Sequence, residues 1–400
     1  MKTIVKSKIQ NPKSKILIVG AGPAGASLAI RLARQDFEVV LIEREKFPRH
    51  KLCGEFISPE GLTHFKDLGV LDEMMAVGGD RIAQTIFYSQ NGKSVSVASK
   101  WFGGGLQSAL SISRAEMDLR LLEKAKSLGV KVLEETQVVG LLTENEKVSG
   151  VKVRFENRET EEVTADLVID ATGRANVLGK LCEKSKTQNS KLKTQNSKLV
   201  GFKTHLENVQ MKKGVCEIYS FRGGYGGLSF VENDLANHCF LAKAEIVREF
   251  SGNTDQILEN VIFKNKRARE TMRDAKPVFD WLAVSVESFG AKNLNPSKNL
   301  LTVGDAAAFI DPFTGSGMLM ALESAEILAQ KIIEYYFSFD EIALNYAAAH
   351  HEKFHKRLLV CDILRRAAFA PKLADWTISG LSFSRKITEL LTRATRPQIS

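Results

Sequence analysis

The chain has 400 residues, 44% of them apolar and 26% charged, which is typical of a soluble globular protein with more than one structural unit and no membrane-spanning helix. Its net charge of +9 is concentrated in residues 180–199 (net +5) and 352–400 (net +6), a distribution that argues against a nucleic-acid-binding groove. Five scattered cysteines without a C-x-x-C pair indicate a reducing compartment and no zinc or iron–sulfur site, so we expect a cytoplasmic protein.

The first regular segment reads as a strand, a glycine turn, a helix and a second strand. Residues 16–19 are all apolar, as in a parallel strand that is buried on both faces. The pattern G-x-G-x-x-G follows at residues 20–25, and apolar residues then recur at helical spacing to about Ala33. A second apolar run, residues 39–42, ends at Glu43. Together these elements predict a dinucleotide-binding turn.

Each part of this turn has a physical role in binding a dinucleotide. Gly20 allows the tight turn, Gly22 lets the backbone approach a pyrophosphate, and Gly25 lets the helix lie close to the sheet. The helix N-terminus, near Ala24, offers unpaired N–H groups and the positive end of its dipole to the phosphates. The carboxylate of Glu43 is placed to accept hydrogen bonds from ribose hydroxyls.

The chain up to about residue 128 alternates helices with a hairpin. Residues 51–55 (Lys-Leu-Cys-Gly-Glu) are loop-like, and Ser58, which precedes a proline, starts a helix. Residues 81–98 are predicted to form a hairpin with an Asn-Gly turn and to begin a second sheet. Ser113 is predicted to cap the next helix, with Glu116 as its capping-box partner.

The middle of the chain reads mainly as strands, the last of which is followed by Asp-Ala-Thr-Gly-Arg at residues 170–174. Residues 186–199 repeat Lys-Thr-Gln-Asn-Ser-Lys-Leu in tandem, and this polar tract is predicted to be a flexible surface insertion. Strand-like runs within residues 200–246 and 277–290 then flank a helical segment at about 255–273.

A further strand-to-glycine turn lies near residue 304. The strand at residues 300–303 leads to Asp305, whose carboxylate can accept hydrogen bonds from the hydroxyls of a cofactor. Pro312, Gly315 and Gly317 keep side chains away from a flat ring. A long helix begins near Gly317, and its N-terminal dipole would stabilise negative charge at the edge of that ring.

Three strand ends with glycine-bearing turns, at residues 20–25, 170–174 and 304–317, can converge on one extended cofactor, because the carboxyl ends of parallel strands form the ligand crevice of an open sheet. The chain resembles the FAD-dependent oxidoreductases with the glutathione-reductase-type flavin fold. The resemblance rests on these three turns, on the Ser-Arg pair at residues 113–114 and on the order of these motifs along the chain. That group includes aromatic hydroxylases, flavin-dependent halogenases and geranylgeranyl reductases. Residues 51–55 and the Gly-Gly-Tyr-Gly-Gly run around Tyr225 most resemble the geranylgeranyl-reductase branch.

The resemblance implies an α/β fold with a Rossmann-like FAD-binding domain (a parallel sheet with helices on both faces), a mixed-sheet substrate domain and a helical C-terminal segment. The expected boundaries are 13–80, 106–180 and 291–335 for the FAD-binding domain, 81–105 and 200–290 for the substrate domain, and 336–400 for the helical segment.

FAD is expected to bind without a covalent link, with Arg114 at the pyrophosphate or ribityl chain and the backbone of Val138 at the adenine. The residues predicted to bind FAD are Gly20, Gly22, Ala24, Gly25, Glu43, Arg44, Arg114, Val138, Gly173, Asp305, Gly315, Gly317 and Met318. No second strand-linked G-x-G-x-x-G is present, so transiently bound NAD(P)H or an external reduced carrier is expected to supply the electrons.

Two reactions remain open for such a protein. The first is reduction of carbon–carbon double bonds of an isoprenoid or other lipophilic substrate by hydride from flavin N5. The second is hydroxylation of an aromatic or polyketide-like substrate through a flavin hydroperoxide. A halogenase is disfavoured because the Trp-x-Trp-x-Ile-Pro signature is missing, and a flavin-holding scaffold without turnover is disfavoured because the binding motifs are intact.

Cys53 and Tyr225 are the candidates for the proton donor or for shaping the catalytic site. Each has an equally weighted structural alternative, a small buried thiol for Cys53 and a packed sheet aromatic for Tyr225.

The basic tail carries a hint about the substrate. Between residues 369 and 395, apolar residues interleave with lysines and arginines, as in a helix that lies on an anionic membrane surface. The alternative is a set of helices packed on the protein's own sheet with a solvated basic face. If the surface interpretation holds, the protein is membrane-associated and its substrate is a lipid.

Overall fold

A five-stranded parallel sheet with strand order β20-β12-β1-β2-β8 lies at the centre of the computed structural model. The structure describes residues 14–186, 198–286, 289–311, 313, 315–336, 338–369, 378, 380 and 385–394. The strands of the central sheet are β1 (Lys15–Val19), β2 (Glu38–Ile42), β8 (Lys131–Leu133), β12 (Leu167–Asp170) and β20 (Leu300–Thr302). Their nearly continuous apolar sequences reflect burial on both faces.

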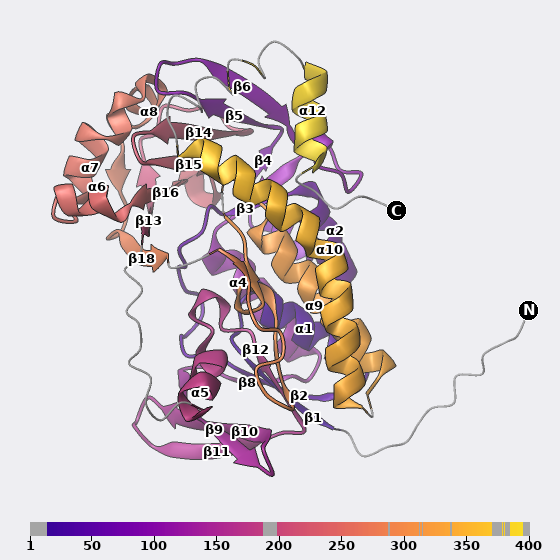
Figure 1. Cartoon of the computed structure of the whole chain (residues 1–400). Coiled ribbons are helices and arrows are strands. Elements are labelled where there is room, and N and C mark those ends of the chain that lie inside the picture. Colours follow the sequence, from indigo (N-terminus) through magenta and orange to yellow (C-terminus); the bar gives the residue numbers. More distant parts are fainter. Residues whose placement is uncertain are drawn as a thin grey trace, which may run out of the picture.

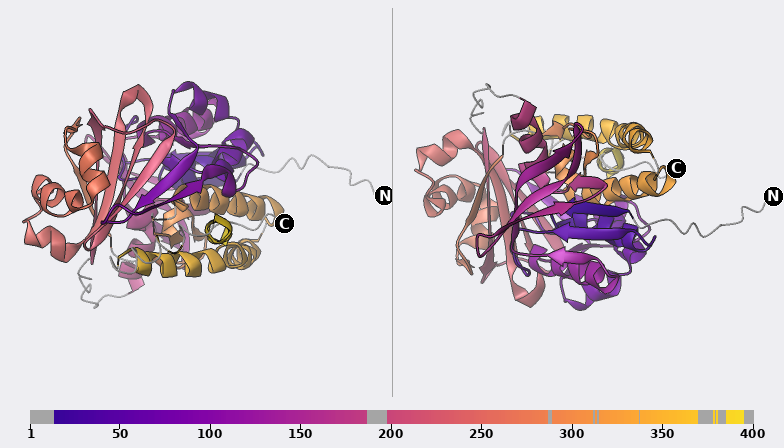
Figure 2. Two further views of the ribbon diagram at one scale, coloured as in Figure 1. Left: turned by 90° about the horizontal axis from the view of Figure 1, so that it is seen from above. Right: turned by 90° about the horizontal axis from the view of Figure 1, so that it is seen from below.

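The two faces of this sheet pack against different layers (Figures 1 and 2). Ile16 and Ile18 face a core shared with α1 (Pro23–Ala33), α4 (Arg114–Ser127) and α9 (Gly317–Glu334). Leu17 and Val19 face a second core. That second core is covered by β9 (Thr136–Glu144), β10 (Lys147–Phe155), β11 (Thr160–Thr164) and α5 (Val177–Lys186).

A second, mixed sheet has the strand order β17-β13-β16-β15-β14-β5-β6, with β18 paired to β13. Within the described residues, β14 and β5 pair in parallel, and all other neighbouring strands of this sheet pair antiparallel. The strands are β5 (Gln84–Tyr88), β6 (Ser94–Ala98), β13 (Leu199–Glu207), β14 (Val215–Phe221), β15 (Gly224–Phe230), β16 (Ala236–Lys243), β17 (Lys276–Pro277) and β18 (Leu282–Val286). Three helices, α6 (Ala244–Glu249), α7 (Thr254–Asn260) and α8 (Lys266–Met272), cover its outer face (Figure 2).

Short elements join the two sheets, and further helices follow toward the C-terminal end. The joining elements are β3 (Phe56–Ile57), α2 (Pro59–Leu68), α3 (Leu71–Ala76), β4 (Asp80–Ile82), β7 (Ala109–Ser111), β19 (Gly290–Ala291) and β21 (Ala308–Phe309). Helix α10 (Phe339–Ala368) runs along α9, and α12 (Arg385–Ala394) lies beside β6 (Figure 1). Among the residues that the structure describes, no helix combines the length and apolarity needed to cross a bilayer.

Two local predictions need correction. The helical segment expected at 255–273 is interrupted, because the side-chain oxygen of Asn265 accepts hydrogen bonds from the first N–H groups of α8 and so begins a new helix there. Ser113 does cap α4, its Oγ accepting from Glu116 N at 3.2 Å. The reciprocal half of the capping box is wrong, since Ser113 N donates to Glu232 Oε2 while Glu116 pairs with Arg120. Most of the tandem repeat at 186–199, and Pro312, lie outside the described residues.

Candidate active site

One cavity of about 1280 Å³ lies between the carboxyl ends of the parallel strands and the inner face of the mixed sheet. Glu43, after β2, and Asp305, after β20, line this same cavity, as binding of one extended cofactor requires. The predicted cofactor residues on its wall are Gly20, Gly22, Ala24, Glu43, Arg44, Arg114, Val138, Gly173, Asp305, Gly315, Gly317 and Met318. Gly25 is buried beneath the turn instead, where a Cβ would stand 1.9 Å from the Gly20 carbonyl oxygen.

The glycine turn holds the N-terminus of α1 against the cavity. Gly20 has a φ of +105°, and a Cβ there would meet the Ala171 carbonyl oxygen at 2.4 Å. This close approach brings the end of β12 against the end of β1, so the turns after both strands reach the cavity together. Gly22 is the N-cap of α1 and Pro23 follows it, which leaves the first N–H groups of the helix at the wall.

Glu43 is buried and already engaged by the protein. Its Oε2 accepts from Ala21 N at 3.0 Å and lies 3.4 Å from an Arg49 nitrogen, while Oε1 accepts from Glu45 N at 3.1 Å. The carboxylate therefore stabilises the glycine turn through Ala21 N and also lines the cavity.

A cluster of cations lines the same end of the cavity: Arg44, Arg49, Lys51 and Arg114. Arg114 donates two hydrogen bonds to Asp118, at 2.8 and 2.7 Å, and Arg49 reaches the same carboxylate at 2.8 Å. Desolvation and the charges of the neighbouring arginines lower the pKa of Lys51 to about 8. This concentration of positive charge fits an anionic pyrophosphate.

Asp305 lines the cavity at the third turn, after β20. Desolvation raises the pKa of its carboxyl, although the charges of Arg174 and Lys292 oppose the rise. Lys292 Nζ donates to the backbone carbonyls of Arg174 and Asp305, at 3.2 and 3.0 Å, and so ties the second turn to the third. A Cβ added to Gly173 would have no atom within 4 Å, so there is room for a ligand beside this glycine.

Asp170 holds the second turn in shape, a role that the sequence did not reveal. Its two carboxylate oxygens accept from the backbone N–H groups of Thr172, Leu178 and Gly179. The N-terminus of α5 is thereby fixed to the end of β12, and both lie at the cavity.

A buried ionic group centred on Glu55 was also missed. Glu55 Oε1 accepts from Arg114 N at 2.7 Å and from the Lys203 ammonium, while Oε2 lies 2.7 Å from His205 Nε2. The side chains of Glu55, Lys203 and His205 are at most 4% exposed. Desolvation raises the pKa of Glu55, but Lys203 and His205 outweigh it and hold that pKa below its usual value. The group joins the loop at 51–55 and the start of α4 to β13 of the mixed sheet.

The predicted catalytic side chains, Cys53 and Tyr225, both line the cavity. The Cys53 thiol accepts from Glu55 N at 3.4 Å and lies 3.9 Å from the sulfur of Met318. The Tyr225 hydroxyl donates to the buried carboxylate of Asp311. Burial and the charge of Asp311 raise the pKa of Tyr225 well above its usual value, so this hydroxyl keeps its proton.

The part of the wall that the mixed sheet contributes is uncharged. The described residues of β5, β6, β13–β16 and β18 that line the cavity include no Asp, Glu, Lys, Arg or His. Aromatic side chains such as Phe87, Phe240 and Tyr225 are prominent among them. The cavity thus has a charged half at the parallel strands and an apolar half at the mixed sheet.

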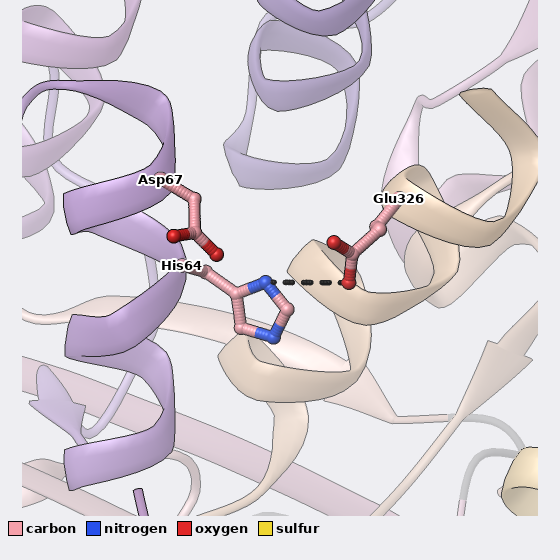
Figure 3. A group of neighbouring side chains, drawn as sticks. All are labelled: His64, Asp67 and Glu326. Atoms are coloured by element: carbon pink, nitrogen blue, oxygen red, sulfur yellow. Dashed lines mark ion pairs between the residues drawn. The ribbon is translucent and has the colours of Figure 1, made fainter. Parts of the chain in front are cut away.

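A group of potential metal ligands lies elsewhere, between α2 and α9. Side-chain atoms of His64, Asp67 and Glu326 all lie within 4.8 Å of one another (Figure 3). The Arg31 guanidinium already supplies a positive charge there, 3.4 Å from Glu326 Oε1 and 3.5 Å from His64 Nδ1. Burial lowers the pKa of His64, so its neutral ring can accept from Arg31. The group reads as an ion-pair network that joins α1, α2 and α9.

Comparison with known proteins gives a family and two kinds of relative. A flavin-dependent halogenase of Armillaria mellea is 25% identical over 367 residues, which cover 82% of this chain and 66% of the halogenase. A digeranylgeranylglycerophospholipid reductase of Methanosarcina acetivorans is 27% identical over 333 residues, which cover 80% of this chain and 75% of the reductase. The alignment thus spans just under two thirds of the halogenase's own length.

Solved structures agree with the fold. A flavin-dependent brominase, Bmp2 in a triple mutant form, superposes with a TM-score of 0.78 at 17% identity, covering 96% of this chain and 95% of the other. A geranylgeranyl bacteriochlorophyll reductase-like protein of Thermoplasma acidophilum superposes with a TM-score of 0.75 at 20% identity, covering 96% of both chains. A family model described as an FAD binding domain matches residues 13–353. The chain therefore belongs to the FAD-binding-domain family and is an FAD-dependent oxidoreductase.

Proposed function

We propose that this protein reduces carbon–carbon double bonds of an isoprenoid or other lipophilic substrate, which it takes from a membrane surface. The observation that carries the proposal is the apolar half of the cavity, whose described wall from the mixed sheet has no charged side chain. Such a wall can bury a hydrocarbon chain but offers no ionic contact to a polar substrate. The name of the reductase relative supports the same substrate class.

We assign the charged half of the cavity to FAD, held by the residues predicted from the sequence. Arg114 and the N-terminus of α1 face the pyrophosphate in this assignment, and Asp305 faces the ribityl hydroxyls. FAD, once reduced by two electrons, would supply the hydride for one alkene carbon, and Cys53 or solvent would supply the proton for the other. The Cys53 carbonyl oxygen accepts from Asn237 Nδ2 of β16 at 3.2 Å and its thiol lies 3.9 Å from Met318 of α9, so Cys53 would lie near both the cofactor and the apolar wall.

Electrons are proposed to come from transiently bound NAD(P)H or from an external reduced carrier. The described chain has one strand-linked dinucleotide turn, which FAD occupies in this assignment. Stopped-flow mixing of the oxidised enzyme with NADH, NADPH or reduced ferredoxin identifies the donor by the rate of flavin bleaching.

Anaerobic reoxidation of photoreduced enzyme tests the reaction itself. We expect a detergent-dispersed prenyl alkene to restore the oxidised flavin spectrum without oxygen, with the saturated product found by mass spectrometry. An enzyme that stays reduced with every alkene, yet oxidises in air and yields a hydroxylated or halogenated product from an aromatic substrate, would overturn the reductase proposal.

Cys53 is expected to matter more to this reaction than Tyr225. Cys53→Ala should slow oxidation of the reduced enzyme by the alkene about a hundredfold, the usual loss for a positioned proton donor. Tyr225→Phe should cost less than about tenfold, since its proton is held by Asp311. The measurement is single-turnover reoxidation, with the bound-FAD spectrum as a check on folding.

Cys216→Ala is the matched control, because Cys216 is another thiol on the cavity wall and burial raises its pKa to about 12. This variant should react at the wild-type rate. A Cys53→Ala enzyme that is as fast as Cys216→Ala would remove Cys53 from the mechanism.

A further inference from the structure

Helix α12 has its threonines buried and its large apolar side chains exposed. Thr388 and Thr392 are 3% and 8% exposed and line the cavity. Ile387 and Leu390 are 52% and 69% exposed. A helix that only covers a protein core normally turns its apolar stripe inward, whereas α12 has its large apolar side chains on the exposed side.

Leu391 connects the outer stripe to the cavity. It is 39% exposed and also lines the cavity wall, so it stands at the rim where the apolar half opens to the surface. The helix is held in this orientation by contacts with β6 and by the Arg385 guanidinium, which lies 5.5 Å from the centre of the Trp101 ring. Figure 1 shows α12 at the outer edge of the molecule, beside β6.

Basic side chains border the exposed stripe. Helical spacing places Lys386 one turn before Leu390 and Arg393 one turn after it, on the same side. Glu389 is the one acidic residue of α12, and it pairs with Arg393 at 2.7 Å. The charges around the stripe therefore favour an anionic surface over a neutral one.

We propose that the outward face of α12, formed by Ile387, Leu390 and Leu391 with Lys386 and Arg393 at its border, docks on an anionic lipid bilayer. The aliphatic side chains enter the boundary between headgroups and acyl chains, and the basic side chains contact the headgroups. Docking there brings the rim at Leu391 to the bilayer, so that a lipid substrate passes into the apolar half of the cavity without crossing water. This passage rests on the proposed function, whereas the docking stands on α12 alone.

Vesicle co-sedimentation of the full-length FAD-bound protein tests the docking. Vesicles of phosphatidylcholine and phosphatidylglycerol in equal parts should bind the wild type, while pure phosphatidylcholine vesicles or high salt should weaken binding about tenfold. Ile387→Ser/Leu390→Ser and Lys386→Glu/Arg393→Glu should each weaken binding to the mixed vesicles about tenfold or more.

The matched control is Val139→Ser/Leu344→Ser. These aliphatic residues are 36% and 70% exposed on β9 and at the start of α10, which lie at the end of the molecule away from α12 in Figure 1. This control should bind vesicles as the wild type does, and all variants should keep the bound-FAD spectrum.

Three outcomes would overturn the proposal. The first is that the wild type does not bind the mixed vesicles, and the second is that both α12 variants bind them as the wild type does. The third is a dimer seen by light scattering without lipid and abolished by Ile387→Ser/Leu390→Ser, which would assign the face to a second copy of the chain.

Turnover measurements separate the docking proposal from the proposed function. α12 variants that reduce a detergent-dispersed alkene normally but fail on a vesicle-embedded one support both, and docking without any alkene reduction defeats the proposed function alone.

Discussion

Glu55→Gln should lower the free energy of unfolding by about 3 to 5 kcal/mol, the usual cost of leaving one member of a buried ion pair uncompensated. Glutamine has nearly the same shape and keeps an oxygen for Arg114 N. It removes the negative charge, however, and leaves the fully buried Lys203 ammonium with neutral acceptors, the retained side-chain oxygen and the Lys51 carbonyl oxygen 3.1 Å away. Urea unfolding of the FAD-saturated protein at neutral pH measures the loss.

A double-mutant cycle shows whether the pair itself causes that loss. Lys203→Met removes the ammonium and should also destabilise the protein, because it leaves the Glu55 carboxylate buried. Glu55→Gln/Lys203→Met removes both charges and should be clearly more stable than the sum of the single effects predicts. Additive single effects would contradict a coupled pair. The matched control is Glu249→Gln, whose partner Arg222 and own side chain are about half exposed, and which should cost less than about 1 kcal/mol.

At acidic pH, the wild type and Glu55→Gln should have the same free energy of unfolding. The folded-state pKa of Glu55 lies below the usual 4.5, so its charge stabilises the fold above that pH and the contribution is lost as the pH falls through the folded value. The free energies of unfolding of the two proteins should therefore differ most at neutral pH and converge once the pH has fallen below the folded-state pKa of Glu55. A difference that persists unchanged into acid would show that the carboxylate charge is not its source.

The sequence predicts the parallel half of the fold because that information is local. Strand, glycine turn and helix follow one another between residues 15 and 33, and the requirement for glycine at positions 20 and 25 is visible in the spacing alone. Three such turns meet at one cavity because the carboxyl ends of parallel strands lie at the same edge of a sheet.

The Glu55 group could not be predicted in the same way. Glu55 and Lys203 are 148 residues apart, and their contact depends on the register of β13 within the mixed sheet. A signal did exist, since Lys203 and His205 are two residues apart in a strand that opens with four uncharged residues, and alternation places them on one face. Their partner was not readable from that pattern. The orientation of α12 is a similar case, because periodicity defines its apolar stripe but not which stripe faces the protein.

Gly20→Ala is the second change with a large expected effect, since it opposes both the backbone conformation and the packing of the cofactor turn. The φ of +105° is open to glycine and strained for alanine. The new Cβ would also lie 2.4 Å from the carbonyl oxygen and 2.7 Å from the carbonyl carbon of Ala171, which are backbone atoms of the neighbouring strand end. Relief requires the turns after β1 and β12 to separate, and both line the cavity.

We expect Gly20→Ala to lose at least about 3 kcal/mol of stability, from strain and overpacking together, and to bind FAD at least about a hundredfold more weakly because the N-terminus of α1 moves away from the pyrophosphate. FAD content after gel filtration and fluorescence titration of the apoprotein measure the second effect. Gly78→Ala separates the two causes: Gly78 has a φ of +86°, but a Cβ there would meet no atom within 4 Å, so it should show the strain alone, about 1 to 2 kcal/mol, with normal FAD affinity. A yellow Gly20→Ala protein with wild-type affinity would mean that the two turns need not meet for FAD to bind.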